Sequence, residues 1–218
     1  MAAPEQTEVT ASERPDFRCW DGVSANSLTV ALSPPVTECV EIDLLDQYNR
    51  SVHGQRILGH LSLMVTTKSA YRQPVGKAFV EAMASRTPLP EDLRERIYTA
   101  IQEAMMNAVL HGNLRIGSGA RDSLEGLTQT HELIERMLAM PDGACSAIRV
   151  DAIWNSKVLH VLVRDSGEGF DRAEVSSPED LAAAGQIASG RGLAILEAIC
   201  DRVMLLHGGR TIKLGFNL

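Results

Sequence analysis

The stretch Glu103-Ala-Met-Met-Asn107-Ala-Val-Leu-His111-Gly112 decides how the rest of the chain is interpreted. Glu103, Asn107 and His111 follow one another at intervals of four residues, so a helix places them in a row along one face. The apolar side chains around them recur at helical spacing on a different face: Ile97, Ile101, Ala104, Met105 and Ala108. A carboxylate and a carboxamide one turn apart suit a shared ligand, because amide oxygens bind Mg²⁺, but the spacing also fits an ordinary solvated face.

Two glycine-rich segments follow later in the chain. Asp165-Ser-Gly167-Glu-Gly169-Phe170 comes directly after an apolar strand, where a carboxylate could accept a hydrogen bond from a base amino group. Ser189-Gly190-Arg191-Gly192-Leu193 precedes a helical pattern, and the free N–H groups of a helix start favour phosphate. Taken singly, each segment also fits an ordinary turn. A phosphate-binding G-x-x-x-x-G-K-[ST] motif is absent, and both G-x-G pairs lack the third glycine of a dinucleotide fingerprint.

Composition excludes several classes of protein. The 218 residues include 21 Lys and Arg against 28 Asp and Glu, and the resulting charge of −7 argues against direct nucleic-acid binding. No apolar run approaches the roughly 18 residues of a membrane span. Acids stand near the N-terminus where a signal peptide has basic and then apolar residues. The four cysteines are scattered without a C-x-x-C pair. We therefore expect a cytoplasmic protein without a membrane partner.

The pattern of elements predicts an α+β fold. Helices and strands interleave, and short turns join the last strands, which implies a mixed, mostly antiparallel sheet with helices on one face. A turn at Ser33-Pro34-Pro35 predicts that the first two strands form a hairpin. The expected strands are 27–32, 39–44, 61–66, 147–153, 158–165, 203–207 and 211–216. The expected helices are 71–84, 90–111, 122–140 and 191–200.

Taken together and in order, the three segments resemble the N, G1 and G2 boxes of the GHKL ATPase/kinase superfamily. E-x-x-x-N-x-x-x-H-G is followed by D-x-G-x-G-F and then G-x-G-L, and the resemblance covers residues 61–218. The chain looks most like the anti-sigma-factor serine/threonine kinases, which have counterparts of Ser189-Gly-Arg-Gly-Leu-Ala-Ile-Leu and of Asp201-Arg-Val. This resemblance implies a two-layer α/β sandwich of the Bergerat type that binds ATP and Mg²⁺.

The resemblance also implies roles for single residues. Glu103 would be the general base, Asn107 would hold Mg²⁺, and Asp165 would bind the adenine amino group. Gly167 and Gly169 would lie beneath the nucleotide, and a lid would run from 171 to 189. The residues expected at the phosphates are Gly190, Arg191, Gly192 and Leu193. Arg191 either neutralises phosphate charge or pairs with an acid of the lid.

Two parts of the chain depart from the simplest members of that family. We expect a loose tail over 1–24, an extension over 25–57, and the ATP-binding domain over 58–218 with a helical insert at about 114–144. His131 in this insert precedes Glu132, as a phospho-accepting histidine would, but it follows the N box and fits a packing role better. Neither addition identifies the partner, which the resemblance suggests is an antagonist protein, a sigma factor or a response regulator. A homodimer is also possible.

Three functions fit the sequence. The first is a kinase that phosphorylates Ser or Thr of a partner protein in bacterial partner switching. The second is an ATP-responsive binding module that does not transfer phosphate, and the third is a stand-alone histidine-kinase catalytic domain. Glu103 favours the first over the second, because a pure binder needs no base at that position.

Overall fold

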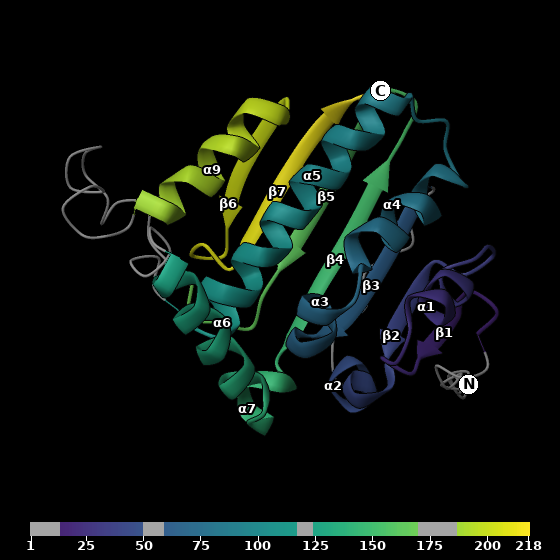
Figure 1. Cartoon of the computed structure of the whole chain (residues 1–218). Helices are drawn as coiled ribbons and strands as arrows, with labels where there is room; N and C mark the ends of the chain where they lie inside the picture. The colour runs from purple at the N-terminus through teal and green to yellow at the C-terminus, as the bar shows by residue number, and fades with distance from the viewer. Residues whose placement is uncertain (1–13, 50–58, 117–123, 170–186) are drawn as a thin grey trace, which may run out of the picture.

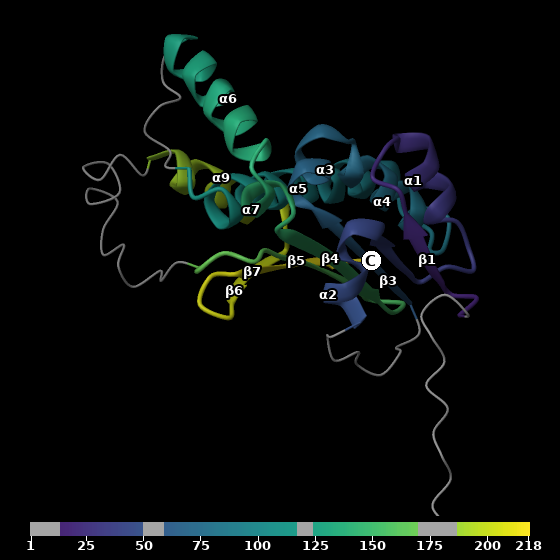
Figure 2. The ribbon, with the colours of Figure 1, turned by 90° about the horizontal axis from the view of Figure 1, so that it is seen from below.

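The chain folds into one mixed sheet with its main helices on one face (Figures 1 and 2). This computed structural model describes residues 14–49, 59–116, 124–169 and 187–218. The seven strands lie in the order β1-β2-β3-β4-β5-β7-β6. The first two pairs in this order are parallel and the remaining four are antiparallel. The predicted α+β sandwich is therefore confirmed.

The antiparallel part of the sheet follows the predicted strands closely. It consists of β3 (His60–Thr66), β4 (Ala147–Trp154), β5 (Val158–Arg164), β7 (Thr211–Asn217) and β6 (Arg202–Leu206). Alternate side chains of β5, namely Leu159, Val161 and Val163, enter the core beneath the helices. This alternation with period two is what a half-buried strand requires.

The helical layer contains α3 (Thr67–Arg72), α4 (Val75–Ala84), α5 (Glu91–Asn107) and α9 (Ile187–Ile199). The single helix predicted over 71–84 is wrong, because Gln73 is extended and Pro74 separates α3 from α4. The predicted start of the last helix is also wrong: α9 begins at Ile187, since Ile187-Ala188-Ser189 continues its pattern backwards. The rest of the expected lid, 171–186, lies outside the described residues.

The predicted N-terminal hairpin is wrong. β1 (Phe17–Trp20) and β2 (Glu38–Glu41) are parallel, and α1 (Ala25–Ala31) connects them. Ser24 caps this helix by accepting a hydrogen bond from the Ser27 N–H at 3.1 Å, and Leu28 and Ala31 face the core. The strand predicted at 27–32 is thus helical, and residues 17–20 of the expected loose tail form a strand. Residues 1–13 of that tail lie outside the described part.

One short helix lies on the other face of the sheet. Residues Ile42–Leu44 form a 3₁₀ turn and lead into α2 (Leu45–Asn49), so the strand predicted to reach residue 44 ends at Glu41. Tyr48 of α2 packs with Phe17, Val40 and Met64 in a second apolar cluster. This end of the sheet is therefore covered on both faces.

The predicted helical insert consists of α6 (Leu124–Leu138) and α7 (Pro141–Ala144). Figure 2 shows α6 standing away from the sheet. It contacts α3 through a hydrogen bond of 3.1 Å between Tyr71 Oη and His131 Nδ1, and through an ion pair between Arg72 and Glu135. His131 is exposed, so the packing role expected for it is wrong. No helix in the described part of the chain is long and apolar enough to cross a membrane.

Candidate functional site

The long helix α5 ends in an unusual way at the first motif. After Asn107 the chain makes a π-helical turn over Ala108–Asn113, in which the Leu114 N–H donates to the Val109 carbonyl at 2.9 Å. Nδ1 of His111 lies 2.8 Å from the Ile116 carbonyl oxygen, so this nitrogen carries the proton and donates. The sequence places His111 in line with Glu103 and Asn107, but its side chain instead bonds the π-helical turn to the segment that follows it, at Ile116. Such π-helical turns are frequent at functional sites.

Asn113 joins this turn to the second motif. Its Oδ1 accepts a hydrogen bond of 2.8 Å from the Ser166 N–H. Its amide nitrogen donates to Thr67 Oγ1 at 2.8 Å and to the Ala147 carbonyl at 3.2 Å. One side chain thus fixes the end of α5, the start of α3 and the turn after β5. Sequence reasoning missed Asn113, although an amide directly after His111-Gly112 was the available signal.

Asp165 lies at the end of β5 under the π-helical turn. A Cβ added to Gly112 would meet the Asp165 Cγ at 2.5 Å, so glycine is required for the carboxylate to fit there. The Gly167 N–H donates to Asp165 Oδ1 at 2.8 Å. Burial raises the pKa of Asp165, and the N–H groups and Arg210 offset this effect in part. The carboxylate is held in place but poorly solvated, which suits a specific donor on a ligand.

The two glycines of the second motif have different surroundings. A Cβ on Gly167 would lie 2.3 Å from the Gly112 carbonyl oxygen, so Gly167 belongs to the packing around Asp165. Gly169 has φ of +84°, and a Cβ there would lie 1.9 Å from the Gly208 carbonyl oxygen. Gly169 therefore packs against the turn of the β6–β7 hairpin. The structure brings Gly167, but not Gly169, against the carboxylate.

Glu103 and Asn107 meet the third motif across the interface of α5 and α9. A Cβ on Gly192 would lie 2.2 Å from Glu103 Oε1 and 3.2 Å from Asn107 Nδ2. Both side chains are half-buried, and no described residue forms an ion pair with Glu103. Leu193 is half-buried, and the burial of Gly190 and Arg191 lies outside the described part of the structure. Because α9 begins at Ile187, residues 190–193 lie within its first two turns and not at its start.

A hollow of about 660 Å³ opens next to the Asp165 turn. Ser166 and Gly167 form one wall, and the insert helices α6 and α7 form the opposite wall. Its apolar lining consists of Leu114, Ile116, Leu133, Met137 and Met140. An ion pair of 2.9 Å between Arg115 and Glu168 connects the end of the π-helical turn to the second motif. The volume lies within the range of small-molecule sites, which are mostly apolar with a few fixed polar groups.

The donor set fits a nucleotide with Mg²⁺. Asp165 supplies an acceptor for a base amino group, and the Gly167 N–H together with the packing at Gly112 holds this carboxylate in place. No cluster of three or more His, Cys, Asp or Glu that could hold a metal occurs among the described residues. Mg²⁺ in phosphate sites needs few protein ligands, because substrate phosphates and waters complete its shell, so the Asn107 amide oxygen suffices as the protein contribution.

Comparison with known proteins agrees with this geometry. No curated protein matches the chain. The family model of the histidine kinase-like ATPase domain matches residues 67–216, which begin at α3 and end in β7 and include all three motifs. This match covers more than half of the 218 residues. The chain therefore belongs to the histidine kinase-like ATPase domains of the GHKL superfamily, whose members bind ATP.

Proposed function

We propose that this protein is a Mg-ATP-dependent kinase that phosphorylates Ser or Thr of a partner protein in bacterial partner switching. The observation that carries the proposal is the position of Glu103. Its carboxylate lies against Gly192 of α9 and one helical turn from Asn107, without an ion pair among the described residues. A carboxylate in this position is available to accept a proton, whereas an ATP-responsive binder without transfer has no use for it.

The nucleotide would lie along the end of α5. Asp165 would accept a hydrogen bond from the adenine amino group, with the base at the Gly167 side of the hollow. Asn107 would hold the metal that bridges the phosphates, and Glu103 would lie beyond it. From Asn107 to Gly112, which covers Asp165, the chain makes a little more than one helical turn, about 5–7 Å along the helix axis. This separation leaves room for the ribose between the two ends of the site.

Arg191, with Gly190 and Leu193, would meet the phosphates from α9. Their proximity to Gly192 in the chain supports this assignment, since Gly192 contacts Glu103 and Asn107. When bound, Mg²⁺ would neutralise phosphate charge during transfer.

In the proposed reaction, Glu103 accepts the proton of the attacking hydroxyl. The partner's Ser or Thr oxygen forms a bond to the γ-phosphorus while the bond from that phosphorus to the β,γ-bridging oxygen breaks. ADP leaves, and the hydroxyl proton moves to Glu103. The rest of the rate enhancement would come from positioning of the reactants by α5 and the glycine contacts, because phosphoryl transfer depends mainly on alignment and charge neutralisation.

Two substitutions test this assignment. Glu103→Gln preserves shape and removes basicity, so ATP affinity should hold while transfer falls by about 10²–10⁴. Asn107→Ala should lose Mg-dependent ATP binding and transfer together. Glu95→Gln, an exposed carboxylate earlier on α5, is the matched control and should change neither.

The assay follows labelled γ-phosphate into a partner protein captured from the native organism with the ATP-loaded protein, and calorimetry measures ATP affinity. An acid-stable product is expected, whereas an acid-labile one would indicate a histidine kinase. A wild-type rate for Glu103→Gln contradicts the role of Glu103. Binding of ATP and partner without any transfer means that the protein is an ATP-responsive binding module.

A further inference from the structure

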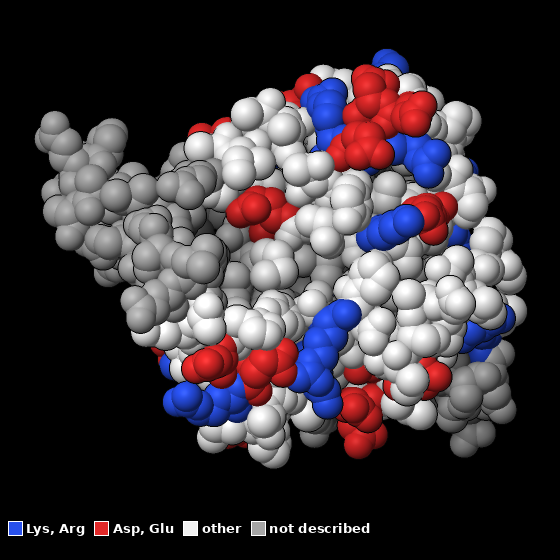
Figure 3. Space-filling view, viewed as in Figure 1, with Lys and Arg blue, Asp and Glu red and all other residues white. Residues whose placement is uncertain are grey.

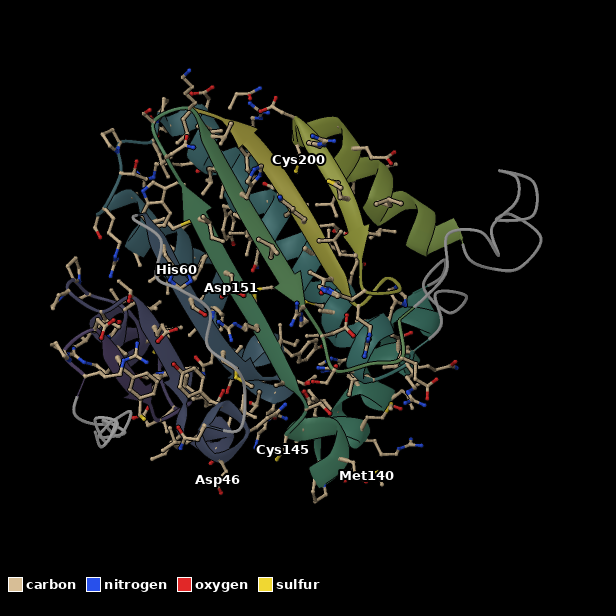
Figure 4. All side chains as sticks on the ribbon, turned by 180° about the vertical axis from the view of Figure 1, so that it is seen from behind. Asp46, His60, Met140, Cys145, Asp151 and Cys200 are labelled. Atoms are coloured by element: carbon tan, nitrogen blue, oxygen red, sulfur yellow. The ribbon has the colours of Figure 1, made fainter. Side chains whose placement is uncertain are left out.

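The sheet face opposite the main helices has an unusual charge distribution. Figure 4 shows this face, and no described helix lies in front of β4, β5, β7 and β6. The strand registers align its side chains in three rows that run across the sheet. These rows are Met64–Arg149–Arg164–Thr211–Leu206, Ser62–Asp151–Leu162–Lys213–Met204 and His60–Ile153–His160–Gly215–Arg202. They carry four Lys or Arg side chains against one Asp, in a chain whose charge is −7.

The one acid on these rows is already compensated. Asp151 Oδ2 pairs with Arg149 Nε at 3.0 Å, and His60 Nε2 lies 3.8 Å from Asp151 Oδ1. Among the described residues neither Lys213 nor Arg202 forms an ion pair. The net positive charge of the face therefore resides on side chains that remain available to a partner.

Two observations show that the positive charges of this face lie near one another. Arg149 and Arg164 are directly opposite each other on β4 and β5, an arrangement that is unfavourable for like charges in a sheet. The buried Nδ1 of His160 has no hydrogen-bond partner. Burial lowers the pKa of His160, and the charges of Lys213 and Arg202 lower it further. A surface that tolerates such repulsion gains most when an anionic group binds to it.

Apolar side chains lie between these charges. Ile153, Leu162 and Leu206 are half-buried, and Met204 is 37 % exposed. The helix side, by contrast, shows acidic and basic groups interspersed (Figure 3). Protein interfaces combine an apolar centre with Arg and Met and a polar rim, and the sheet face has these components.

We propose that this face of β4, β5, β7 and β6, which no described helix covers, docks an acidic surface of another protein. Phosphate polymers and anionic membrane surfaces fit less well, because their charged groups offer no apolar partner to the side chains of Ile153, Leu162 and Met204. A second copy placed face to face would oppose like charges. The inference does not depend on phosphotransfer, since this face is separated from the nucleotide site by the sheet.

The dimensions of the face set the strength of such a complex. Four strands at about 4.8 Å and three rows at about 6.8 Å spacing give a surface of roughly 14 by 14 Å between the outermost backbone positions, and the side chains extend it further. An interface of a few hundred Å² per partner belongs to the transient class. We therefore expect a weak complex that depends on salt.

A labelled amphipathic peptide with one leucine face and one glutamate face is a suitable probe, and fluorescence anisotropy measures its binding to the full chain. The wild type should bind it, and raising the salt from 50 to 500 mM should weaken binding. Lys213→Glu combined with Arg202→Glu should reduce affinity by about tenfold or more. Lys77→Glu, an exposed lysine on α4, makes the same charge change on the helix side and should leave affinity within about twofold.

Further comparisons decide among occupants. A lysine version of the peptide should not bind, and Met204→Ser should weaken binding of the glutamate peptide without changing the melting temperature. The proposal is overturned if the glutamate peptide does not bind the wild type, or if it binds the wild type and the double variant with equal affinity. Binding of phosphatidylserine vesicles or of a single-stranded oligonucleotide in preference to the peptide, lost in the double variant, identifies a different occupant and also overturns it. The proposal is also overturned if the wild type self-associates in a sedimentation experiment and the double variant does not.

Discussion

Gly192→Ala tests the central contact of the site without any knowledge of the partner. The new Cβ would lie 2.2 Å from Glu103 Oε1, whereas ordinary contacts begin at 3.4 Å, so the carboxylate has to move by about 1.2 Å. The neighbouring Asn107 amide, at 3.2 Å, needs to move by only a few tenths of an ångström. Because Glu103 Oε1 is the end of a flexible side chain, the protein should remain folded and the geometry of the site should change.

Stability measurements in two backgrounds isolate this contact. Alanine within a helix is favoured over glycine by about 0.5–1 kcal/mol, and forcing Glu103 off its rotamer costs about 0.5–1.5 kcal/mol. In the wild type these terms nearly cancel, so urea unfolding should show little change. With Glu103→Ala present the conflict is gone, and Gly192→Ala should stabilise by the full helix term. Ala194→Gly, an exposed position on α9, should destabilise equally in both backgrounds.

The same substitution should impair function. A displacement of about 1 Å from productive geometry costs up to roughly 10² in rate, so Gly192→Ala should slow ATP turnover by about that factor while ATP binding persists. The reasoning fails if Gly192→Ala has equal effects on stability with and without Glu103, since the two residues would then not touch. An unchanged turnover rate would separately contradict the functional role of the contact.

Further predictions concern the second motif. Asp165→Asn should lower ATP affinity about ten- to a hundred-fold by calorimetry, because it removes the negative charge and replaces one of the two acceptor oxygens with an NH₂ donor, while the Gly167 N–H already uses the other. It should also raise the melting temperature of the free protein: the folded state raises the pKa of Asp165, so its ionised form destabilises the fold at neutral pH. Because the pKa of Asp165 is raised, its carboxylate becomes protonated at a higher pH than an ordinary aspartate. As the pH is lowered, the ATP affinity of the wild type should therefore begin to fall at that higher pH, and Asp165→Asn should lack this pH dependence. Gly167→Ala places a Cβ 2.3 Å from the Gly112 carbonyl and should destabilise by about 1–3 kcal/mol in urea unfolding, in contrast to the near-neutral Gly192→Ala. Asn113→Ala removes three side-chain hydrogen bonds, with the Ser166 N–H, Thr67 and the Ala147 carbonyl, and should cost about 1–3 kcal/mol in total.

The antiparallel half of the fold could be predicted from sequence, and the N-terminal part could not. β4 alternates the polar residues Arg149 and Asp151 with apolar neighbours, and β5 is an apolar run rich in valine, so both are recognisable as strands. A short turn at Asn155-Ser156 determines their pairing. The segment 25–31 is too short for helical periodicity to be visible. Its helix depends on the Ser24 cap and on packing of Leu28 in the core, which the linear pattern does not reveal. Parallel pairing of β1 with β2 is a long-range consequence of that helix.

The candidate site shows the same division between local and long-range information. Motif spacing selected Glu103, Asn107 and Asp165, which the structure places along one helix and at the adjoining strand end. It also placed His111 in line with the first two, because a regular α-helix was assumed where the chain forms a π-helical turn. Asn113 was missed because its partners, at Ser166, Thr67 and Ala147, come from three distant segments.

The site can also be recognised from residues that lower the stability of the folded state. Gly192 lies inside a helix, where alanine would be more stable, and the space its missing side chain leaves is filled by the Glu103 carboxylate. Asp165 is a carboxylate whose pKa burial raises, so ionisation at neutral pH opposes folding. These unfavourable features lie at the two ends of one helical stretch, around Asn107 and Gly112. Removing the first would take changes at both Gly192 and Glu103, and removing the second a change at Asp165, so all three residues fit the proposed ligand site better than they fit a role in stability.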